Sequence, residues 1–201
     1  MPRRYVPVFE RISAIHDCVP SCEKILDLGG GDGIYAPFLS DKARMVVCLD
    51  LDVERLRRAK KVCKFVVRGD AARLPFPDKA FDAVWASELI EHLPSLFVFN
   101  EIERVADQVI ATMPNLLGPI LLVDFSHMLH LRYAMPMFSR FLEQRKWKYG
   151  VEGLGLCLPF PVPLSMKKAF LNLSRHRPWL AFTILIRGKF NMKDVRSYRG
   201  S

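Results

Sequence analysis

Short apolar runs alternate with amphipathic stretches through the first half of the chain. Hydrophobic residues recur at helical spacing over residues 7–19, which predicts an amphipathic helix. Five later runs have the length and composition of buried strands, and helical patterns fall between them. The predicted strands span residues 24–28, 45–51, 65–67, 81–86 and 108–113, and the predicted helices span residues 34–39, 53–62 and 95–106.

This alternation predicts an α/β fold with a parallel sheet and right-handed crossovers. The pattern changes after Pro114. Residues 115–148 are rich in Leu, Phe and Met and show no clear strand, whereas residues 153–160 and 179–187 predict two more strands. We therefore expect seven strands in all, with a different arrangement in the last third of the chain.

The densest motif is a glycine-rich turn after the first predicted strand, where residues 25–33 read ILDLGGGDG. Glycines allow positive φ and let a ligand approach the backbone closely, and ligands of open parallel sheets bind beside such turns. The second predicted strand ends in Asp50 and the third is followed by Gly69-Asp70-Ala71. The Asp50 carboxylate can accept hydrogen bonds from both hydroxyls of a ribose, and Asp70 can accept one from an adenine amino group. These strand ends predict a nucleotide-like ligand in one crevice.

Three strings in the correct order resemble the class I S-adenosylmethionine-dependent methyltransferases, in particular the type 11-like group. They are ILDLGGGDG, CLDLD and GDAARLPFPDKAFDAVWASELIEHLP, and the resemblance covers about residues 22–115. It implies a doubly wound, Rossmann-like and mostly parallel seven-stranded sheet with an antiparallel last strand and helices on both faces. It also implies S-adenosyl-L-methionine as cofactor and methylation of an acceptor, which we expect to be a small or hydrophobic molecule.

The resemblance further implies which residues hold the cofactor. The glycines and Asp27 would surround its methionine part and ribose, Asp50 would hold the ribose hydroxyls, and Ser87 would line the methionine end. Asp70 and Ala71 would meet the adenine. The expected set is Asp27, Gly29, Gly31, Gly33, Asp50, Leu51, Asp70, Ala71 and Ser87. Residues 104–108 (RVADQ) replace the family's Lys-Pro-Gly-Gly-type turn, so we expect a shortened connection there.

Two carboxylates and an imidazole follow the fourth predicted strand. If this segment is helical, Glu88, Glu91 and His92 share one face, where they can act as a base or bind a divalent cation. The pattern resembles one that holds magnesium in small-RNA 3′-terminal 2′-O-methyltransferases, with His127 or His130 as a further ligand here. It also occurs in family members without a metal, and we expect none. His92 is the first candidate base because its unperturbed pKa lies near neutrality, and Glu88 is the second.

Chain length and charge refine this picture. With 201 residues we expect one methyltransferase domain, in which residues 115–150 form a helical lid over the acceptor and residues 151–190 carry the last two strands. The apolar lid favours a hydrophobic acceptor. The net charge of +9 leaves RNA open as an alternative acceptor, with or without metal assistance.

Two other classes of function remain as alternatives. Gly31, Gly33 and Ala36 fit the G-x-G-x-x-A fingerprint of nicotinamide dinucleotide oxidoreductases, although Asp27 and the GDAARLPFP string have no role there. A non-catalytic binding module with this fold is the third class.

Five scattered cysteines predict free thiols, and the lack of a long apolar run or signal peptide predicts a cytoplasmic protein with no stable membrane insertion.

Overall fold

The computed structural model describes residues 8–93, 97–115, 143–145, 148–156, 163–176 and 181–190. The chain forms two compact units, residues 1–113 and 114–201. Its strands have the hydrogen-bonded order β3-β2-β1-β4-β5-β7-β6, and the last strand is antiparallel to its partner β6. The predicted class of fold, a mostly parallel seven-stranded sheet with an antiparallel last strand, is therefore confirmed. Its organisation as a single domain stays a prediction.

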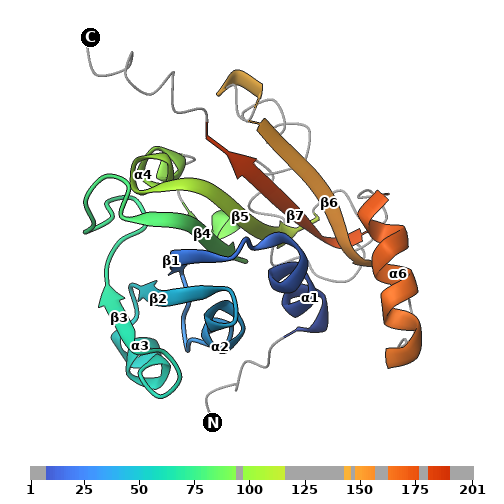
Figure 1. Ribbon diagram of the computed structural model, residues 1–201, viewed down its shortest axis with the longest axis horizontal. Helices are drawn as coiled ribbons and strands as arrows, with labels where there is room; N and C mark the ends of the chain where they lie inside the picture. The colour runs from blue at the N-terminus through green and yellow to red at the C-terminus, as the bar shows by residue number, and fades with distance from the viewer. Residues whose placement is uncertain are drawn as a thin grey trace. The chain divides into compact units, whose positions relative to one another are not determined.

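The first unit contains five parallel strands (Figure 1). They are β1 (Cys22–Leu28), β2 (Ala43–Asp50), β3 (Phe65–Arg68), β4 (Phe81–Ser87) and β5 (Ala106–Pro114). All five predicted strands are confirmed, with shifts of one to two residues at most ends. The carboxyl halves of β1, β2, β4 and β5 are largely buried and mostly apolar, as expected for strands covered on both faces. Parallel pairing brings the carboxyl ends of the strands to one edge of the sheet.

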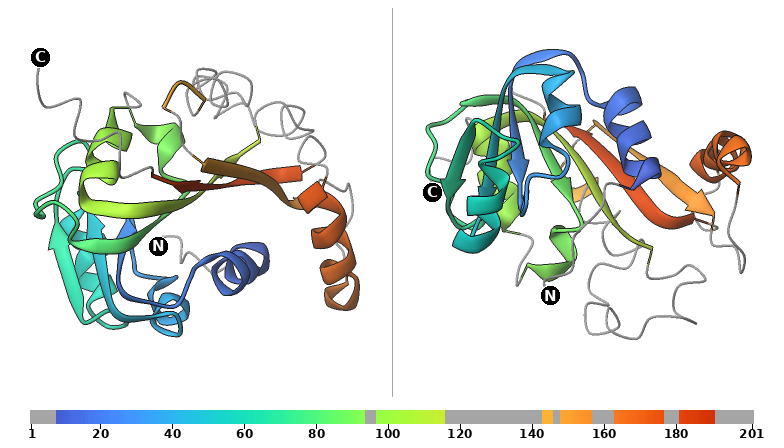
Figure 2. Two further views of the ribbon diagram at one scale, coloured as in Figure 1. Left: turned by 45° about the horizontal axis from the view of Figure 1, so that its top comes forward. Right: turned by 90° about the horizontal axis from the view of Figure 1, so that it is seen from below.

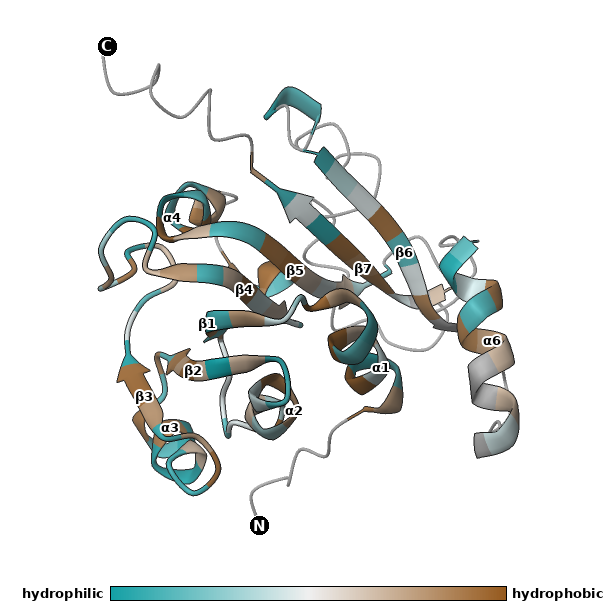
Figure 3. Cartoon of the chain, in the orientation of Figure 1, coloured by the Kyte–Doolittle hydropathy of each residue, from teal (hydrophilic) through white to brown (hydrophobic). Residues whose placement is uncertain are grey.

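Helices cover both faces of these five strands. One face carries α1 (Phe9–Cys18), α2 (Ala36–Ser40) and α3 (Val53–Ala59), and the other carries α4 (Val98–Val105) (Figure 2). α3 begins after Asp52, whose carboxylate accepts hydrogen bonds from the backbone N–H groups of Glu54 and Arg55 and so caps the helix. The buried face of α4 contains the predicted positions Val98, Ile102 and Val105, together with Phe99. Figure 3 shows hydrophobic residues along β3 and both hydrophobic and hydrophilic residues in α3.

The second unit contains β6 (Lys148–Leu156), α6 (Leu164–His176) and β7 (Ala181–Lys189). β6 and β7 pair antiparallel, and α6 packs against β6, where the Ser174 hydroxyl donates to the Gly153 carbonyl at 3.2 Å. The sequence predicted β6 about five residues too late, because Gly150, Gly153 and Gly155 interrupt its alternation. Residues 148–150 of the predicted lid are therefore strand. Residues 116–142 of that segment lie outside the described residues.

In the part of the chain that the structure describes, we find no helix that is long and apolar enough to span a membrane.

Candidate functional site

The glycine-rich turn leaves the buried end of β1 and leads toward α2. Gly29, Gly31 and Gly33 have φ values of +70°, +55° and +73°. This left-handed conformation strains residues with a β-carbon, so the turn requires glycine at these positions. The backbone N–H groups of Gly29 and Gly30 donate to the Leu49 carbonyl of β2, at 2.8 Å and 3.1 Å. The turn is therefore bound to the end of the neighbouring strand.

Asp50 joins the glycine turn to the end of β2. Its Oδ2 accepts a hydrogen bond from the Gly31 N–H at 2.9 Å, and its Oδ1 accepts one from the Asp52 N–H at 2.9 Å. The residue is 9% exposed. The predicted convergence of the glycine turn with the acid of the second strand is therefore present in the structure. The role of Asp50 toward a ribose stays a prediction.

Asp27 is buried beneath the turn and carries an unusual carboxyl group. It is 2% exposed, and among the described residues its Oδ2 has no hydrogen-bond partner. Burial, followed by the nearby charge of Asp50, raises the pKa of Asp27 to about 7. Gly30 allows this arrangement, because a β-carbon there would lie 2.6 Å from Asp27 Oδ2 and would collide with Cys48 Sγ.

The helix α3 is tied to the glycine turn by charge. Asp32 forms ion pairs with Arg58 at 3.0 Å and with Arg55 at 3.6 Å. Leu51, between Asp50 and this helix, is 60% exposed and so offers apolar surface beside the acid. The combination places an anionic group and an apolar side chain next to each other at the end of β2.

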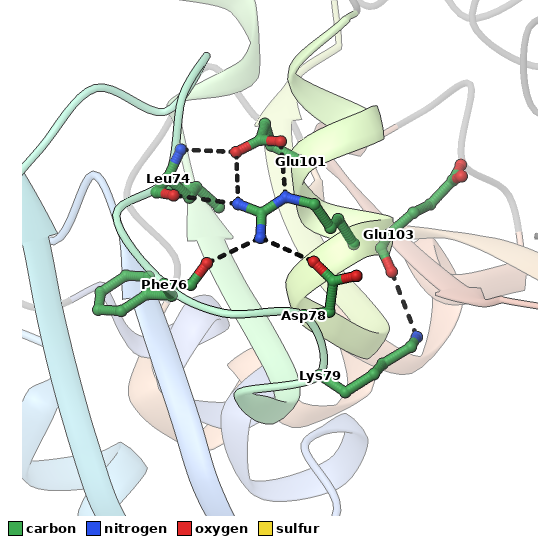
Figure 4. A network of polar contacts seen from close by, with 7 residues as sticks. Leu74, Phe76, Asp78, Lys79, Glu101 and Glu103 are labelled. Atoms are coloured by element: carbon green, nitrogen blue, oxygen red, sulfur yellow. Dashed lines mark hydrogen bonds and ion pairs between the residues drawn. The ribbon is translucent and has the colours of Figure 1, made fainter. Parts of the chain in front are cut away.

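The segment that follows β3 is held against α4 by Arg104 (Figure 4). The Arg104 guanidinium donates to both carboxylate oxygens of Glu101, at 2.8 Å and 2.7 Å, and to the carbonyls of Leu74 and Phe76, at 3.0 Å and 2.7 Å. Glu101 also accepts from the Leu74 N–H at 2.7 Å. This network fixes the path of the loop after Asp70, whose own carboxylate accepts from the Ala72 N–H at 2.9 Å. Asp70 is exposed and Ala71 is buried, and their predicted contact with adenine is untested.

The segment after β4 differs from the predicted helix. Glu88 has a positive φ of 51° and precedes a short 3-10 helix, η1 (Ile90–His92). Glu88, Glu91 and His92 therefore do not share one α-helical face. Glu91 is 1% exposed, whereas the His92 side chain is 55% exposed, and His92 Nε2 lies 3.9 Å from Glu91 Oε1. Burial, followed by the charge of Glu88, raises the pKa of Glu91 to about 8.

Ser87 lies at the end of β4, as predicted. Its hydroxyl is 3.0 Å from the Thr112 hydroxyl of β5, and the Glu88 N–H donates to the Thr112 carbonyl at 2.9 Å. The ends of β4 and β5 are thereby joined. Its predicted place at the methionine end of the cofactor stays a prediction, as do the catalytic roles of His92 and Glu88.

No group of three or more metal-ligating side chains comes together within the described ranges. His127 and His130, the further ligands considered from the sequence, lie outside those ranges.

Two residues beside the site were not found from the sequence. Arg11 of α1 forms an ion pair with Glu88 at 3.0 Å and donates to the Tyr35 hydroxyl at 3.5 Å. Tyr35 follows the glycine turn and is 6% exposed. The one signal in the sequence was the charged Arg11 within the amphipathic helix α1. That pattern does not indicate which strand end the helix approaches.

The region with these strand ends matches a known family. Residues 26–108 match the model described as a methyltransferase domain. The matched residues make up less than half of the chain. The matched residues include the glycine turn, Asp50, Asp70 and the segment that contains Glu88.

Curated relatives of the methyltransferase domain share part of the chain. A probable S-adenosylmethionine-dependent methyltransferase of Mycolicibacterium smegmatis is 34% identical over 93 residues, which cover 45% of this chain and 35% of that protein. A demethylmenaquinone methyltransferase of Tropheryma whipplei is 26% identical over 140 residues, covering 62% of this chain and 54% of that protein. The chain thus spans about a third to a half of the length of these relatives.

Solved structures resemble the chain over more of its length. A SAM-dependent methyltransferase from Archaeoglobus fulgidus has a TM-score of 0.66 and 17% sequence identity, covering 89% of this chain and 91% of that chain. At this sequence identity, the similarity supports the fold of the chain and no particular activity.

Proposed function

We propose that this chain is an enzyme that transfers a methyl group from S-adenosyl-L-methionine to a small or hydrophobic acceptor. The observation that carries the proposal is the meeting of Asp50 with the Gly31 N–H, within a region that matches a methyltransferase domain. An acid beside a glycine turn at neighbouring strand ends suits the ribose of an adenosyl group.

The residues of this edge fit the cofactor. An ionised carboxylate has about four lone-pair sites, and the backbone N–H groups of Gly31 and Asp52 use two of those on Asp50. Two sites are left for the two ribose hydroxyls. The exposed side chain of Leu51 provides apolar surface for the adenine, and the buried Oδ2 of Asp27 suits the positively charged amino group of the methionine part.

When bound, S-adenosyl-L-methionine supplies a methyl group that its sulfonium already activates. The chain therefore has mainly to hold and align the two reactants. The glycine turn and Asp50 would hold the donor, and the end of β4 would border the acceptor. If the acceptor must lose a proton, the exposed imidazole of His92 is better placed to exchange it with solvent than the buried Glu91.

A thermal-shift experiment tests cofactor binding. S-adenosylhomocysteine at about 100 times its dissociation constant should stabilise the folded chain by about 2.7 kcal/mol, which corresponds to a rise in Tm of about 5–10 °C. Nicotinamide dinucleotides at the same concentration should leave the Tm unchanged. A shift with NAD in place of S-adenosylhomocysteine would favour the oxidoreductase and refute the proposal.

A pair of substitutions tests the role of Asp50. Asp50→Asn keeps the shape of the side chain and should weaken S-adenosylhomocysteine binding by about 1.5–3 kcal/mol, the range for hydrogen bonds to charged groups. Asp41→Asn, at an exposed carboxylate beyond α2, is the matched control and should bind as the wild type does. Equal affinity in the two variants would place the ribose elsewhere.

The class of acceptor is proposed from the relative that acts on demethylmenaquinone, a small hydrophobic molecule. It can be tested with a donor labelled on its methyl group, offered to a lipid and quinone extract and separately to total RNA. We expect label in the organic phase. Label only in acid-precipitated RNA would show that the alternative acceptor class is correct.

A further inference from the structure

The N-terminal helix reaches the candidate site through one side chain. Arg11 of α1 is three-quarters or more buried, and its guanidinium lies between two elements that are far apart in the sequence. Its Nη2 is 3.0 Å from Glu88 Oε1 after β4, and its Nη1 is 3.5 Å from the Tyr35 hydroxyl after the glycine turn. A planar guanidinium has five donors in a fixed geometry and suits such a bridging position.

The partner on the β4 side is held in an unusual conformation. Glu88 has a φ of +51°, which residues other than glycine rarely adopt and which persists only where the surroundings stabilise it. The turn at Glu88 places Leu89 directly against the glycine turn, because a β-carbon at Gly29 would lie 2.8 Å from Leu89 Cδ1. The conformation of Glu88 is thus coupled through Leu89 to the first residue of the glycine turn.

The partner on the other side fixes the far end of the same turn. Tyr35 is two residues beyond Gly33, and its ring meets the ring of Trp85 in β4 edge-on, with centroids 6.1 Å apart. Its hydroxyl also accepts a hydrogen bond from the Val8 N–H at 3.4 Å, at the start of α1. Arg11 therefore contacts Tyr35, which follows the glycine turn, and Glu88, whose neighbour Leu89 lies against the start of that turn.

We propose that Arg11 is a positioning residue for the glycine turn, because its contacts with Glu88 and Tyr35 hold the two ends of that turn in the geometry that binds the methyl donor. Arg11 itself touches no reacting atom. The expected effect on donor binding rests on the proposed function. The expected restraint on the glycine turn applies to the ligand-free protein as well. Without the guanidinium, the Glu88 carboxylate would face the buried Glu91 with the ion pair to Arg11 removed, which disfavours the observed turn.

Substitutions at Arg11 test this role in the full chain. Arg11→Met retains the apolar stem and removes the charge, and it should weaken S-adenosylhomocysteine binding about tenfold or more, as expected for the loss of a largely buried charged contact. Arg11→Lys should fall between this variant and the wild type. The matched control is Arg44→Met, which removes an arginine that pairs with Glu23 at 3.5 Å on the surface, with 81% of its side chain exposed. Arg44→Met should bind as the wild type does.

Hydrogen exchange of the ligand-free protein provides a readout that does not depend on the cofactor. The backbone N–H groups of Gly29, Gly30 and Gly33 are hydrogen-bonded, so loosening of the turn should be visible as faster exchange. We expect exchange about tenfold faster over residues 29–36 in Arg11→Met, and no change in Arg44→Met. A double-mutant cycle with Glu88→Gln should show coupling, with the double variant binding more tightly than the product of the two single effects predicts.

The outcomes separate the two proposals. A folded Arg11→Met variant with wild-type affinity and wild-type exchange would overturn the positioning role, even if its Tm were lower. If Arg11→Met does not fold, Arg11→Lys and Glu88→Gln decide by the same two measurements. If the wild type does not bind S-adenosylhomocysteine, the proposed function fails, and the exchange data alone still support or overturn the contacts of Arg11 as the restraint on the turn.

Discussion

Replacing Gly30 with alanine tests how tightly the glycine turn lies over the buried carboxyl of Asp27. Unlike its three neighbours, Gly30 does not have a left-handed φ, so the cost of a β-carbon there is steric. The new atom would lie 2.6 Å from Asp27 Oδ2 and 2.8 Å from Asp27 Cγ, and would collide with Cys48 Sγ. Both side chains are on buried strands, since Cys48 is 0% and Asp27 2% exposed, so neither can move into solvent.

Overpacking of this kind costs about 1–3 kcal/mol. For a chain of this size, Gly30→Ala should therefore lower the Tm by about 2–12 °C, and urea unfolding should show the same loss of free energy with an unchanged m-value. Gly150→Ala is the matched control, because the nearest atom to a β-carbon there is 3.9 Å away. Cys48→Ala removes the sulfur, so the double variant should be less destabilised than the sum of the two single variants. Equal stability of Gly30→Ala and Gly150→Ala, or strict additivity with Cys48→Ala, would refute the described packing.

Two further predictions concern a buried proton and the loop after β3. Because the pKa of Asp27 is raised from 3.8 to about 7, the folded chain holds a proton that the unfolded chain releases. Stability from this group is complete below pH 3.8 and is lost as the pH rises to 7, with a slope of up to about 1.4 kcal/mol per pH unit, and Asp27→Asn should reduce that slope in urea titrations. An unchanged slope would contradict the buried carboxyl. Arg104→Met should cost about 1–3 kcal/mol and accelerate tryptic cleavage at the exposed Arg73, because it removes the bonds to Glu101 and to two loop carbonyls. Arg57→Met, at an exposed Arg–Glu pair on α3, should change neither, and similar cleavage rates in both variants would argue against the Arg104 network.

The five strands of the first unit, in their order along the chain, could be predicted from the sequence because each is a short apolar run that ends in a turn signal. The meeting of Asp50 with Gly31 followed from parallel pairing, since neighbouring strands end at one edge. The position of β7 between β5 and β6 was not predicted, because strand order in the sheet is set by packing over long sequence separations.

The segment after β4 shows where local pattern fails. The spacing of Glu88, Glu91 and His92 is the same whether the segment is an α-helix or a left-handed residue followed by a 3-10 turn. The observed conformation is associated with an ion pair between Glu88 and Arg11, which lies 77 positions earlier in the chain. No local sequence pattern therefore predicts this conformation. α6 was not predicted from the sequence either.

The Arg104 network has a practical consequence for the loop between β3 and β4. Arg104 binds the carbonyls of residues 74 and 76, and Lys79 Nζ binds those of Glu103 and Ala106, so the path of this loop is specified largely through main-chain atoms. Main-chain recognition tolerates a change of side chain. The exposed Pro77 is consequently a suitable attachment point for a fluorophore or cross-linker, introduced as a cysteine, that leaves the path of the loop unchanged.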